Sequence, residues 1–259
     1  MRWLDRLRPR KPAANPDHMA VALSCAKAGD YAAALAIWEP LAQAGFSRAQ
    51  NNIGACFAEG LGVTVDLNLA RRWLQLAAEA GDPVGQRNYA ALHMREADAD
   101  FEIAADFYRR AAEQGDAPSQ DMLSWMLLEG SVMNADPVEA RHWAEQAASA
   151  GIASSMTRLG MLYHNARGVR RDPEMAARWW GRGARNGDAD AQAMLGAALH
   201  MGSGIEPDGV CALAWLIRAE MGGSDLAKPF LEVVRSSLSA EEIGEAEQRA
   251  AGPISGEMR

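Results

Sequence analysis

Small and apolar residues recur along this chain with one regular period. Glycines mark it, and they stand 36, 34, 36, 36 and 36 residues apart, at Gly45, Gly81, Gly115, Gly151, Gly187 and Gly223. A fixed period of this length is typical of repeat proteins, in which each unit is a small motif that buries its apolar face against its neighbours. The pattern therefore predicts five copies of one structural unit.

The first half of each repeat alternates polar residues with apolar and small ones at helical spacing. A small residue stands four places after the boundary glycine, and a large apolar residue followed by a small one stands eight and nine places after it, as in Leu159-Gly160. Three places later come Phe57, His93, Leu127, Tyr163 and Leu199. Spacings of three and four residues place one packed stripe on an α-helix, and its small residues let a second helix approach closely.

An aspartate in the middle of each repeat predicts where a second helix begins: Asp66, Asp100, Asp136, Asp172 and Asp208. Its carboxylate can accept the free N–H groups of a helix start, and the prolines after Asp136 and Asp172 suit a first helical turn. Alanine and then an aromatic residue follow at fixed distances, the aromatic residues being Trp73, Phe107, Trp143, Trp179 and Trp215. Each repeat is therefore predicted to form a helical hairpin that ends at a glycine.

The segments that flank the repeats predict caps. We divide the chain into a basic flexible arm (1–16), an N-terminal capping helical pair (17–45), five repeats (46–81, 82–115, 116–151, 152–187 and 188–223), and C-terminal capping helices with a tail (224–259). Pro40 is expected to kink or loosen the last turn of its helix. At the other end, helices are predicted over 226–238 and 240–251, the second opened by the capping box Ser239-x-x-Glu242.

The repeat motif resembles the signature of the Sel1-like repeat family, a branch of the tetratricopeptide superfamily. Its parts are Leu159-Gly160-x-x-Tyr163, Arg167-Gly168-Val169, Asp172-Pro173, Ala176-x-x-Trp179 and Gly187, and comparable sets cover residues 45–223. The resemblance implies an all-α fold, a right-handed α/α superhelical solenoid of helical hairpins with a concave face lined by the first helices. It also implies a non-enzymatic scaffold or adaptor that binds a partner protein or peptide in that groove, with bacterial signalling and secretion among the roles open to it.

If the groove follows the tetratricopeptide pattern, residues three, six, ten and thirteen places after each boundary glycine line it. This selects Arg48, Asn51, Arg87, Met94, Asp121, Trp125, Leu128, Thr157, Met161, His164 and His200. Trp125 and Met161 replace the alanine found at the tenth place in the other repeats. Large apolar side chains are therefore expected in the middle of the groove, within a charged rim. Such a site can anchor a peptide or helix. The alternative is that curvature buries Trp125 between repeats.

The charge of the chain narrows the classes of partner. A formal net charge of −8 argues against nucleic acid as a partner. The first twelve residues have the opposite charge, because they contain five basic residues and one aspartate. An alternative hypothesis is therefore a membrane-surface regulator recruited by this arm, with membrane contact through residues 1–12 only. No apolar run is long enough to cross a bilayer.

Candidate chemistry is sparse. The three cysteines, Cys25, Cys56 and Cys211, are far apart, which favours a reducing cytoplasm over a disulfide framework. Secreted family members that bind penicillin carry paired cysteines within each repeat, and those pairs are missing here.

Catalytic and cofactor motifs are absent from the sequence, so we expect neither an enzyme, nor a cofactor, nor a small-molecule substrate. His164 and His200 occupy equivalent places in adjacent repeats, and a hydrolase or metal-binding protein that uses them is a further alternative, although no third ligand is evident. His93 is expected to pack in the place that Phe57 and Tyr163 occupy.

Overall fold

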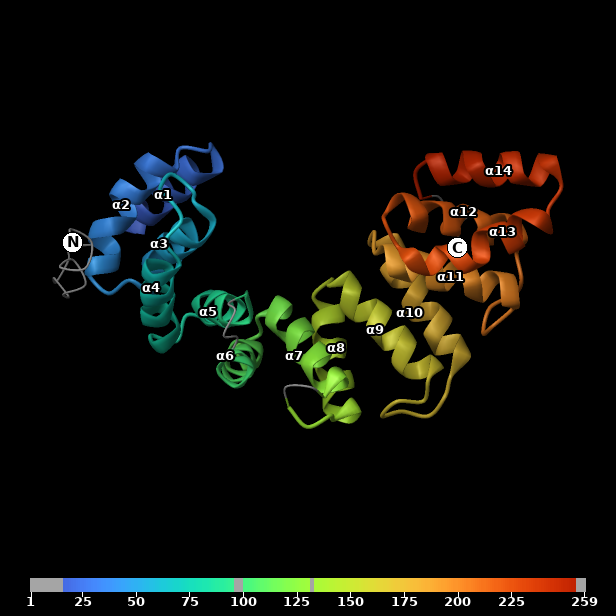
Figure 1. Cartoon of the computed structure of the whole chain (residues 1–259), viewed down its shortest axis with the longest axis horizontal. Helices are drawn as coiled ribbons and strands as arrows, with labels where there is room; N and C mark the ends of the chain where they lie inside the picture. The colour runs from blue at the N-terminus through green and yellow to red at the C-terminus, as the bar shows by residue number, and fades with distance from the viewer. Residues whose placement is uncertain (1–15, 96–99, 131–132, 255–259) are drawn as a thin grey trace. The chain divides into compact units, whose positions relative to one another are not determined.

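The computed structural model describes residues 16–95, 100–130 and 133–254, and within these ranges the chain is helical without strands. The helices, shown in Figure 1, are α1 (Pro16–Lys27), α2 (Tyr31–Gln43), α3 (Ser47–Glu59), α4 (Leu67–Glu79), α5 (Pro83–Arg95), α6 (Phe101–Glu113), α7 (Ala117–Glu129), α8 (Pro137–Ser149), α9 (Ala153–His164), α10 (Pro173–Arg185), α11 (Ala189–Met201), α12 (Gly209–Met221), a 3-10 turn (Asp225–Ala227), α13 (Lys228–Ser236) and α14 (Ala240–Ala251). The all-α prediction is confirmed.

The aspartates predicted to start the second helices do so in all five repeats. Each carboxylate accepts a backbone N–H two or three residues ahead, for example Asp66 from Leu69 at 2.9 Å and Asp172 from Met175 at 3.0 Å. Asp100, Asp136 and Asp208 cap α6, α8 and α12 in the same way. Because these contacts join near neighbours in the chain, the sequence alone could locate them.

Small residues nine places after the boundary glycines let the second helix of a hairpin pack closely against the first. A Cβ atom added at Gly54 would lie 2.6 Å from Leu74 Cγ, and one added at Gly196 would lie 2.7 Å from Leu216 Cγ. At Gly160 the added atom would overlap the indole ring of Trp180. The close approach that the sequence pattern predicted is therefore present, and a side chain at these glycines would push the paired helices apart.

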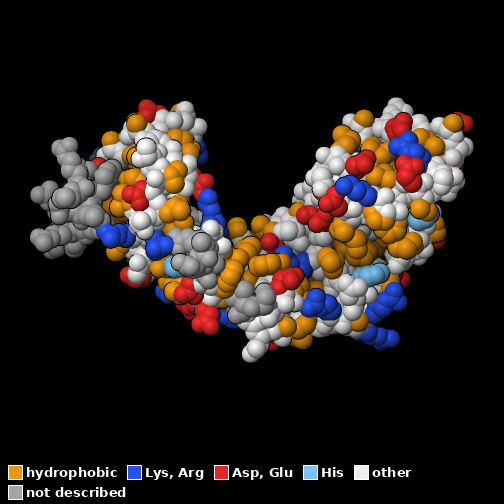
Figure 2. Space-filling view, in the orientation of Figure 1, with side chains coloured by type: hydrophobic (Ala, Val, Ile, Leu, Met, Phe, Trp, Pro, Cys, Tyr) orange, Lys and Arg blue, Asp and Glu red, His pale blue; other side chains and the backbone are white. Residues whose placement is uncertain are grey.

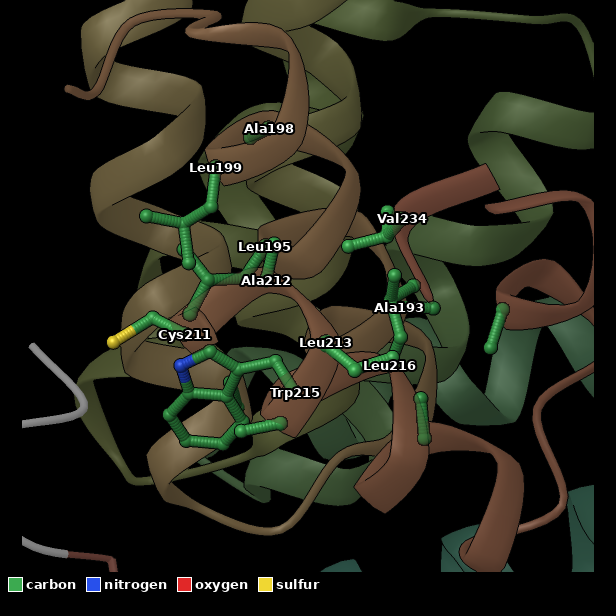
Figure 3. Packing of buried hydrophobic residues seen from close by; sticks show 14 of the residues in the cluster. Ala193, Leu195, Ala198, Leu199, Cys211, Ala212, Leu213, Trp215, Leu216 and Val234 are labelled. Atoms are coloured by element: carbon green, nitrogen blue, oxygen red, sulfur yellow. The ribbon is translucent and has the colours of Figure 1, made fainter. Parts of the chain in front are cut away.

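The chain divides into two compact units, residues up to Leu123 and residues from Ser124 onward, and each has its own core. In the N-terminal unit Trp38, Ile53, Phe57 and Trp73 lie in one buried cluster. The larger cluster of the C-terminal unit contains Trp180, Leu195 and the α12 residues Leu213, Trp215 and Leu216. Figure 3 shows Trp215 beside Cys211, with Leu213 and Leu216 of the same helix also in that packing.

The buried face of the second helices differs from the prediction. Trp73 and Trp215 are fully buried, but Phe107, Trp143 and Trp179 are only partly buried. The next residue along is buried in all five repeats, as Leu74, Tyr108, Ala144, Trp180 and Leu216 show. A second helix packs against its own partner and against the next repeat, so its buried stripe is two positions wide, and the repeat pattern does not show which position is covered in each repeat.

The two capping regions form helices close to those predicted. Pro40 lies inside α2, which continues to Gln43. The predicted helix at 226–238 begins instead as the 3-10 turn and continues as the shorter α13, which has Pro229 in its first turn, while α14 has the expected capping box at Ser239 and Glu242. The arm predicted over 1–16 lies outside the described residues except for Pro16, as does the end of the tail (255–259).

Two of the three free cysteines are buried, and this makes a prediction about their reactivity. Burial raises the pKa of Cys56 to about 11 and is the largest cause that raises the pKa of Cys211 to about 11. Because the neutral thiol is favoured in the folded state, roughly one molecule in a thousand carries a thiolate at either position at pH 8. We expect iodoacetamide to label both thiols about a hundredfold more slowly in the native protein than in guanidinium chloride, as followed by mass spectrometry. Equal rates would show that these side chains are accessible.

Candidate functional site

A hollow in the C-terminal unit brings together several of the residues predicted to line a groove. It encloses about 260 Å³ and is lined by α7, α9, the turn after α9 and the start of α11, through Trp125, Leu128, Glu129, Ser154, Thr157, Arg158, Met161, Leu162, Asn165, Arg167, Asp188 and Asp190. Pockets for drug-sized ligands are larger, at about 300–1,000 Å³. The hollow therefore suits one or two side chains of a partner better than an enclosed small molecule.

Two large apolar side chains of this hollow are exposed. Trp125 is 36% exposed and Met161 is 43% exposed. Leu128, one turn after Trp125 on α7, packs on the buried cluster that contains Leu159 and Leu162. Trp125 is thus exposed, and the alternative that curvature buries it between repeats is wrong. Figure 2 shows hydrophobic side chains at the surface of this unit.

The polar rim of the hollow is held in place by hydrogen bonds. The guanidinium group of Arg167 donates to the carbonyl oxygen of Leu128 at 2.8 Å. Thr157 Oγ1 donates to Asp188 at 2.7 Å, and the same carboxylate accepts the N–H of Ala191 at 2.8 Å and so caps α11. The hollow is lined by groups of both charges, namely Arg158 and Arg167 together with Glu129, Asp188 and Asp190.

The predicted rim residues Arg48 and Arg87 lie in the N-terminal unit and make contacts that the sequence did not predict. Arg48 Nε donates to Asp82 at 2.8 Å, and Arg87 Nη1 donates to Asp116 at 2.7 Å. The two carboxylates are buried and also cap the first turns of α5 and α7. Arg87 is therefore largely engaged between repeats, whereas Arg48 keeps about half of its side chain, 49%, in solvent.

We call this arrangement the inter-repeat latch: an aspartate directly after the boundary glycine caps its own first helix and accepts a hydrogen bond from the first helix before it. Asp82, Asp116 and Asp188 form it with Arg48, Arg87 and Thr157. The glycine-aspartate pairs are visible in the sequence, but the contact to the preceding repeat is not. At the corresponding place Ile152 precedes α9 without a side-chain cap.

The remaining predicted groove residues do not line this hollow. Asn51 is only 3% exposed and accepts a hydrogen bond from Asn88 at 2.8 Å, so it has little surface to offer. Met94 and Asp121 are partly buried and do not line the hollow. His164 lies against Trp180 with ring centroids 5.5 Å apart, and His200 is partly buried on α11.

The histidines give little support to metal chemistry. Among the described residues no group of three or more His, Cys, Asp and Glu side chains is placed to hold a metal ion. His93 packs edge-to-face against Tyr89 with ring centroids 4.6 Å apart, in the aromatic position that the repeat pattern predicted. Its role in the structure is thus accounted for by packing.

The first-helix face of the N-terminal unit has a smaller hollow of about 140 Å³. At the tenth place of its repeats stand Ala55 and Ala91, where the C-terminal unit has Trp125 and Met161. The rest of its lining consists of Ala58, Leu74, Asn88, Leu92 and the Arg95–Glu59 ion pair. Large apolar anchors are therefore a property of the C-terminal hollow.

The latch makes a prediction about stability. Asp116→Ala removes the cap on α7 and the partner of Arg87, and it should lower the free energy of unfolding by about 1–2 kcal/mol, the range measured for lost helix caps. Asp106→Ala is the matched control, because its carboxylate is exposed and lies 3.7 Å from Arg110 in a helical pair. Urea denaturation followed by circular dichroism compares the two, and an equal loss in both variants would contradict the structural role of the latch.

Comparisons with known proteins agree with this architecture. The family model for the Sel1 repeat matches residues 47–82, 83–116, 117–152, 153–188 and 189–224. A Sel1 repeat protein from Oxalobacter formigenes has a similar solved structure, with a TM-score of 0.81 and 27% identity over 92% of this chain and 100% of that one.

Two further relatives are longer than this chain. The protective antigen c5321 of uropathogenic Escherichia coli, which displays an SLR fold, matches with a TM-score of 0.83 and 27% identity over 90% of this chain and 51% of its own. A Sel1-like repeat-containing protein of Acanthamoeba polyphaga mimivirus is 29% identical over 85 residues, 33% of this chain and 16% of that protein. This chain therefore spans about half the length of the first and about a sixth of the second. Since the repeat model covers more than half of the residues, the chain belongs to the Sel1 repeat family.

Proposed function

We propose that this protein is a non-catalytic scaffold that binds a partner protein in the cytoplasm, and that the hollow around Trp125 and Met161 holds an apolar anchor side chain of that partner. The observation that carries the proposal is the pair of exposed large apolar side chains in one hollow. Sel1 repeat proteins are generally non-catalytic, and their fold typically serves protein interaction.

The energetics of the hollow favour a partner. Apolar area removed from water contributes about 25 cal/mol per Å² to binding, and aromatic side chains in well-packed pockets commonly dominate a protein interface. Because Arg167, Thr157 and Asp188 are already held by internal hydrogen bonds, the rim needs little rearrangement when the hollow is filled. A preordered rim lowers the entropic cost of binding.

The proposal changes the predicted set of binding residues. It keeps Trp125, Leu128, Thr157 and Met161, which line the hollow, and gives no binding role to Asn51 or Arg87, which are engaged within the structure. A role in bacterial signalling or secretion remains part of the proposal. Arg87→Glu would be a poor test of it, because the new carboxylate would lie beside Asp116 and disrupt the latch.

The test compares proteins captured from a lysate of the native host by immobilised wild type and by a Trp125→Ala/Met161→Ala variant. Met201→Ala/Met221→Ala is the matched control, because both methionines are well exposed and lie outside the hollow. We expect a protein that the wild type and the control retain and the first variant loses, and that binds purified wild type directly. Equal retention by all three would show that the hollow is not the binding site.

A further inference from the structure

A second surface on the C-terminal unit, separate from the hollow, has an unusual charge. Residues 170–185 contain five arginines, Arg170, Arg171, Arg178, Arg182 and Arg185, against the two acids Asp172 and Glu174. The segment thus carries a formal charge of +3. Because the whole chain carries −8, the residues outside this segment carry −11. Lys and Arg side chains gather near the turn between α9 and α10 at the lower edge of this unit in Figure 2.

Three of these arginines form one stripe on α10. Arg178, Arg182 and Arg185 are spaced by four and three residues, which places them on one face of the helix, and all three are exposed. The opposite face buries Ala176, Trp180 and Ala184 against the C-terminal core. The stripe therefore points away from the packing that α10 makes with α9 and α11.

The stripe continues into a shallow hollow at the start of α10. This hollow encloses about 530 Å³ and is lined by Tyr163, Val169, Arg170, Arg171, Asp172, Pro173 and Glu174. Glu174 joins the two features, because it lines the hollow and lies 3.6 Å from Arg178. Both partners of that ion pair are more than 70% exposed, so water competes with it.

Most of the positive charge is not used within the described part of the chain. Arg170, Arg182 and Arg185 form no ion pair there, and the guanidinium group of Arg182 lies over the ring of Trp179 at 4.8 Å. Asp172 is occupied in capping α10, and Arg171 donates to the carbonyl oxygen of His164 at 3.3 Å. The arginines therefore keep donors available for an anionic group.

Helix stability explains only part of this arrangement. Cations in the last turn, as at Arg182 and Arg185, interact favourably with the helix dipole, but cations before the first turn, as at Arg170 and Arg171, do not. The other second helices have at most one arginine at the three equivalent positions, which are Arg72, Leu76 and Glu79; Asp106, Arg110 and Glu113; His142, Gln146 and Ser149; and Ala214, Arg218 and Met221. The stripe is thus a feature of this repeat and not of the repeat pattern.

We propose that the arginine stripe of α10 and the adjoining hollow bind an acidic segment of a protein partner. A helix of 13 residues is about 20 Å long, which matches a short acidic peptide. Arginine pairs with carboxylates through two parallel hydrogen bonds, and an arginine beside a partly buried tryptophan is typical of protein interfaces. A long nucleic acid or an anionic membrane would also meet the acidic remainder of the chain, which repels it.

The test uses the full chain and a fluorescein-labelled ten-residue polyglutamate peptide, with polyglutamine as the neutral peptide control, and measures fluorescence anisotropy at low and high salt. We expect saturable binding of polyglutamate that weakens at high salt and falls about tenfold or more in Arg178→Glu/Arg182→Glu. Arg178→Gln/Arg182→Gln removes the charge without reversing it and should lose most of the binding. Circular dichroism checks that both variants remain helical.

Matched controls separate this surface from general charge and from the first proposal. Arg72→Glu changes the equivalent position on α4 and should leave peptide binding unchanged, as should Trp125→Ala/Met161→Ala, which alters only the hollow of the proposed function. Failure of polyglutamate to bind, an equal loss in Arg72→Glu, or tighter binding of single-stranded DNA or of phosphatidylserine vesicles through the same arginines would overturn the proposal.

Discussion

Replacing Trp215 with alanine is expected to lower the free energy of unfolding by about 3–5 kcal/mol, the range found when a buried aromatic side chain is truncated. Trp215 is fully buried on α12, in the cluster that joins the last repeat to α13 and α14. Figure 3 shows Leu195, Cys211 and Ala212 around its ring, and none of these side chains can fill the space that the indole would leave. A cavity would remain, and the contacts between the last repeat and its cap would weaken.

Two variants distinguish burial from repeat position. Trp143 stands at the same place in its own repeat, but it is partly buried, and its indole N–H donates to Glu139 at 3.1 Å. Trp143→Ala should therefore lower the free energy of unfolding clearly less than Trp215→Ala does. Trp215→Phe keeps an aromatic ring and removes an indole N–H that has no hydrogen-bond partner. This variant should therefore lower the free energy of unfolding only slightly.

Urea denaturation followed by circular dichroism measures all three variants. Repeat proteins can unfold in more than one step, so the midpoints are compared as well as the extrapolated free energies. If Trp143→Ala destabilises the protein as much as Trp215→Ala, the repeat position and not the burial would decide the contribution of these residues.

Replacing Trp125 with alanine is expected to weaken binding of the partner by about 2 kcal/mol or more, roughly a thirtyfold rise in Kd, while the stability of the protein changes little. The side chain is 36% exposed, so its truncation leaves no closed cavity in the core. The truncation would remove the exposed indole surface that lines the hollow together with Met161. The effect should therefore separate from any loss of helix content.

Isothermal titration calorimetry with the purified partner gives the affinity, and a parallel denaturation curve gives the stability. Trp125→Phe retains an aromatic anchor and should lose less affinity than Trp125→Ala. Burial of apolar surface also predicts a negative heat-capacity change on binding, which should become smaller in Trp125→Ala. An unchanged Kd in Trp125→Ala would show that the exposed indole is not an anchor.

The latch and the hollow use the same helical face for different purposes. In the N-terminal unit the sixth and third places hold Arg87 and Arg48, which join neighbouring repeats through buried aspartates. In the C-terminal unit Thr157 takes over that contact with a shorter side chain, and it does so at the edge of the hollow. Stability between repeats and an open surface are thus achieved with different residue types at equivalent positions.

The sequence by itself determined the parts of this protein that depend on neighbours within one hairpin. The left-handed boundary glycines, the five aspartate caps and the capping box at Ser239 each act over a few residues, and the structure has all of them. The same regularity predicted an all-α repeat fold and the Sel1 family, because stacked hairpins require small residues at fixed places.

Only the tertiary structure decided what equivalent positions do. Arg87 and Trp125 both stand on the predicted groove face, yet one is engaged with a buried aspartate while the other is exposed in a hollow. Trp179 and Trp215 share a repeat position, yet only Trp215 is fully buried. The reason is physical: burial and pairing depend on side chains contributed by the next repeat, about 36 residues away, and a repeat pattern records what the copies share while these contacts arise where they differ.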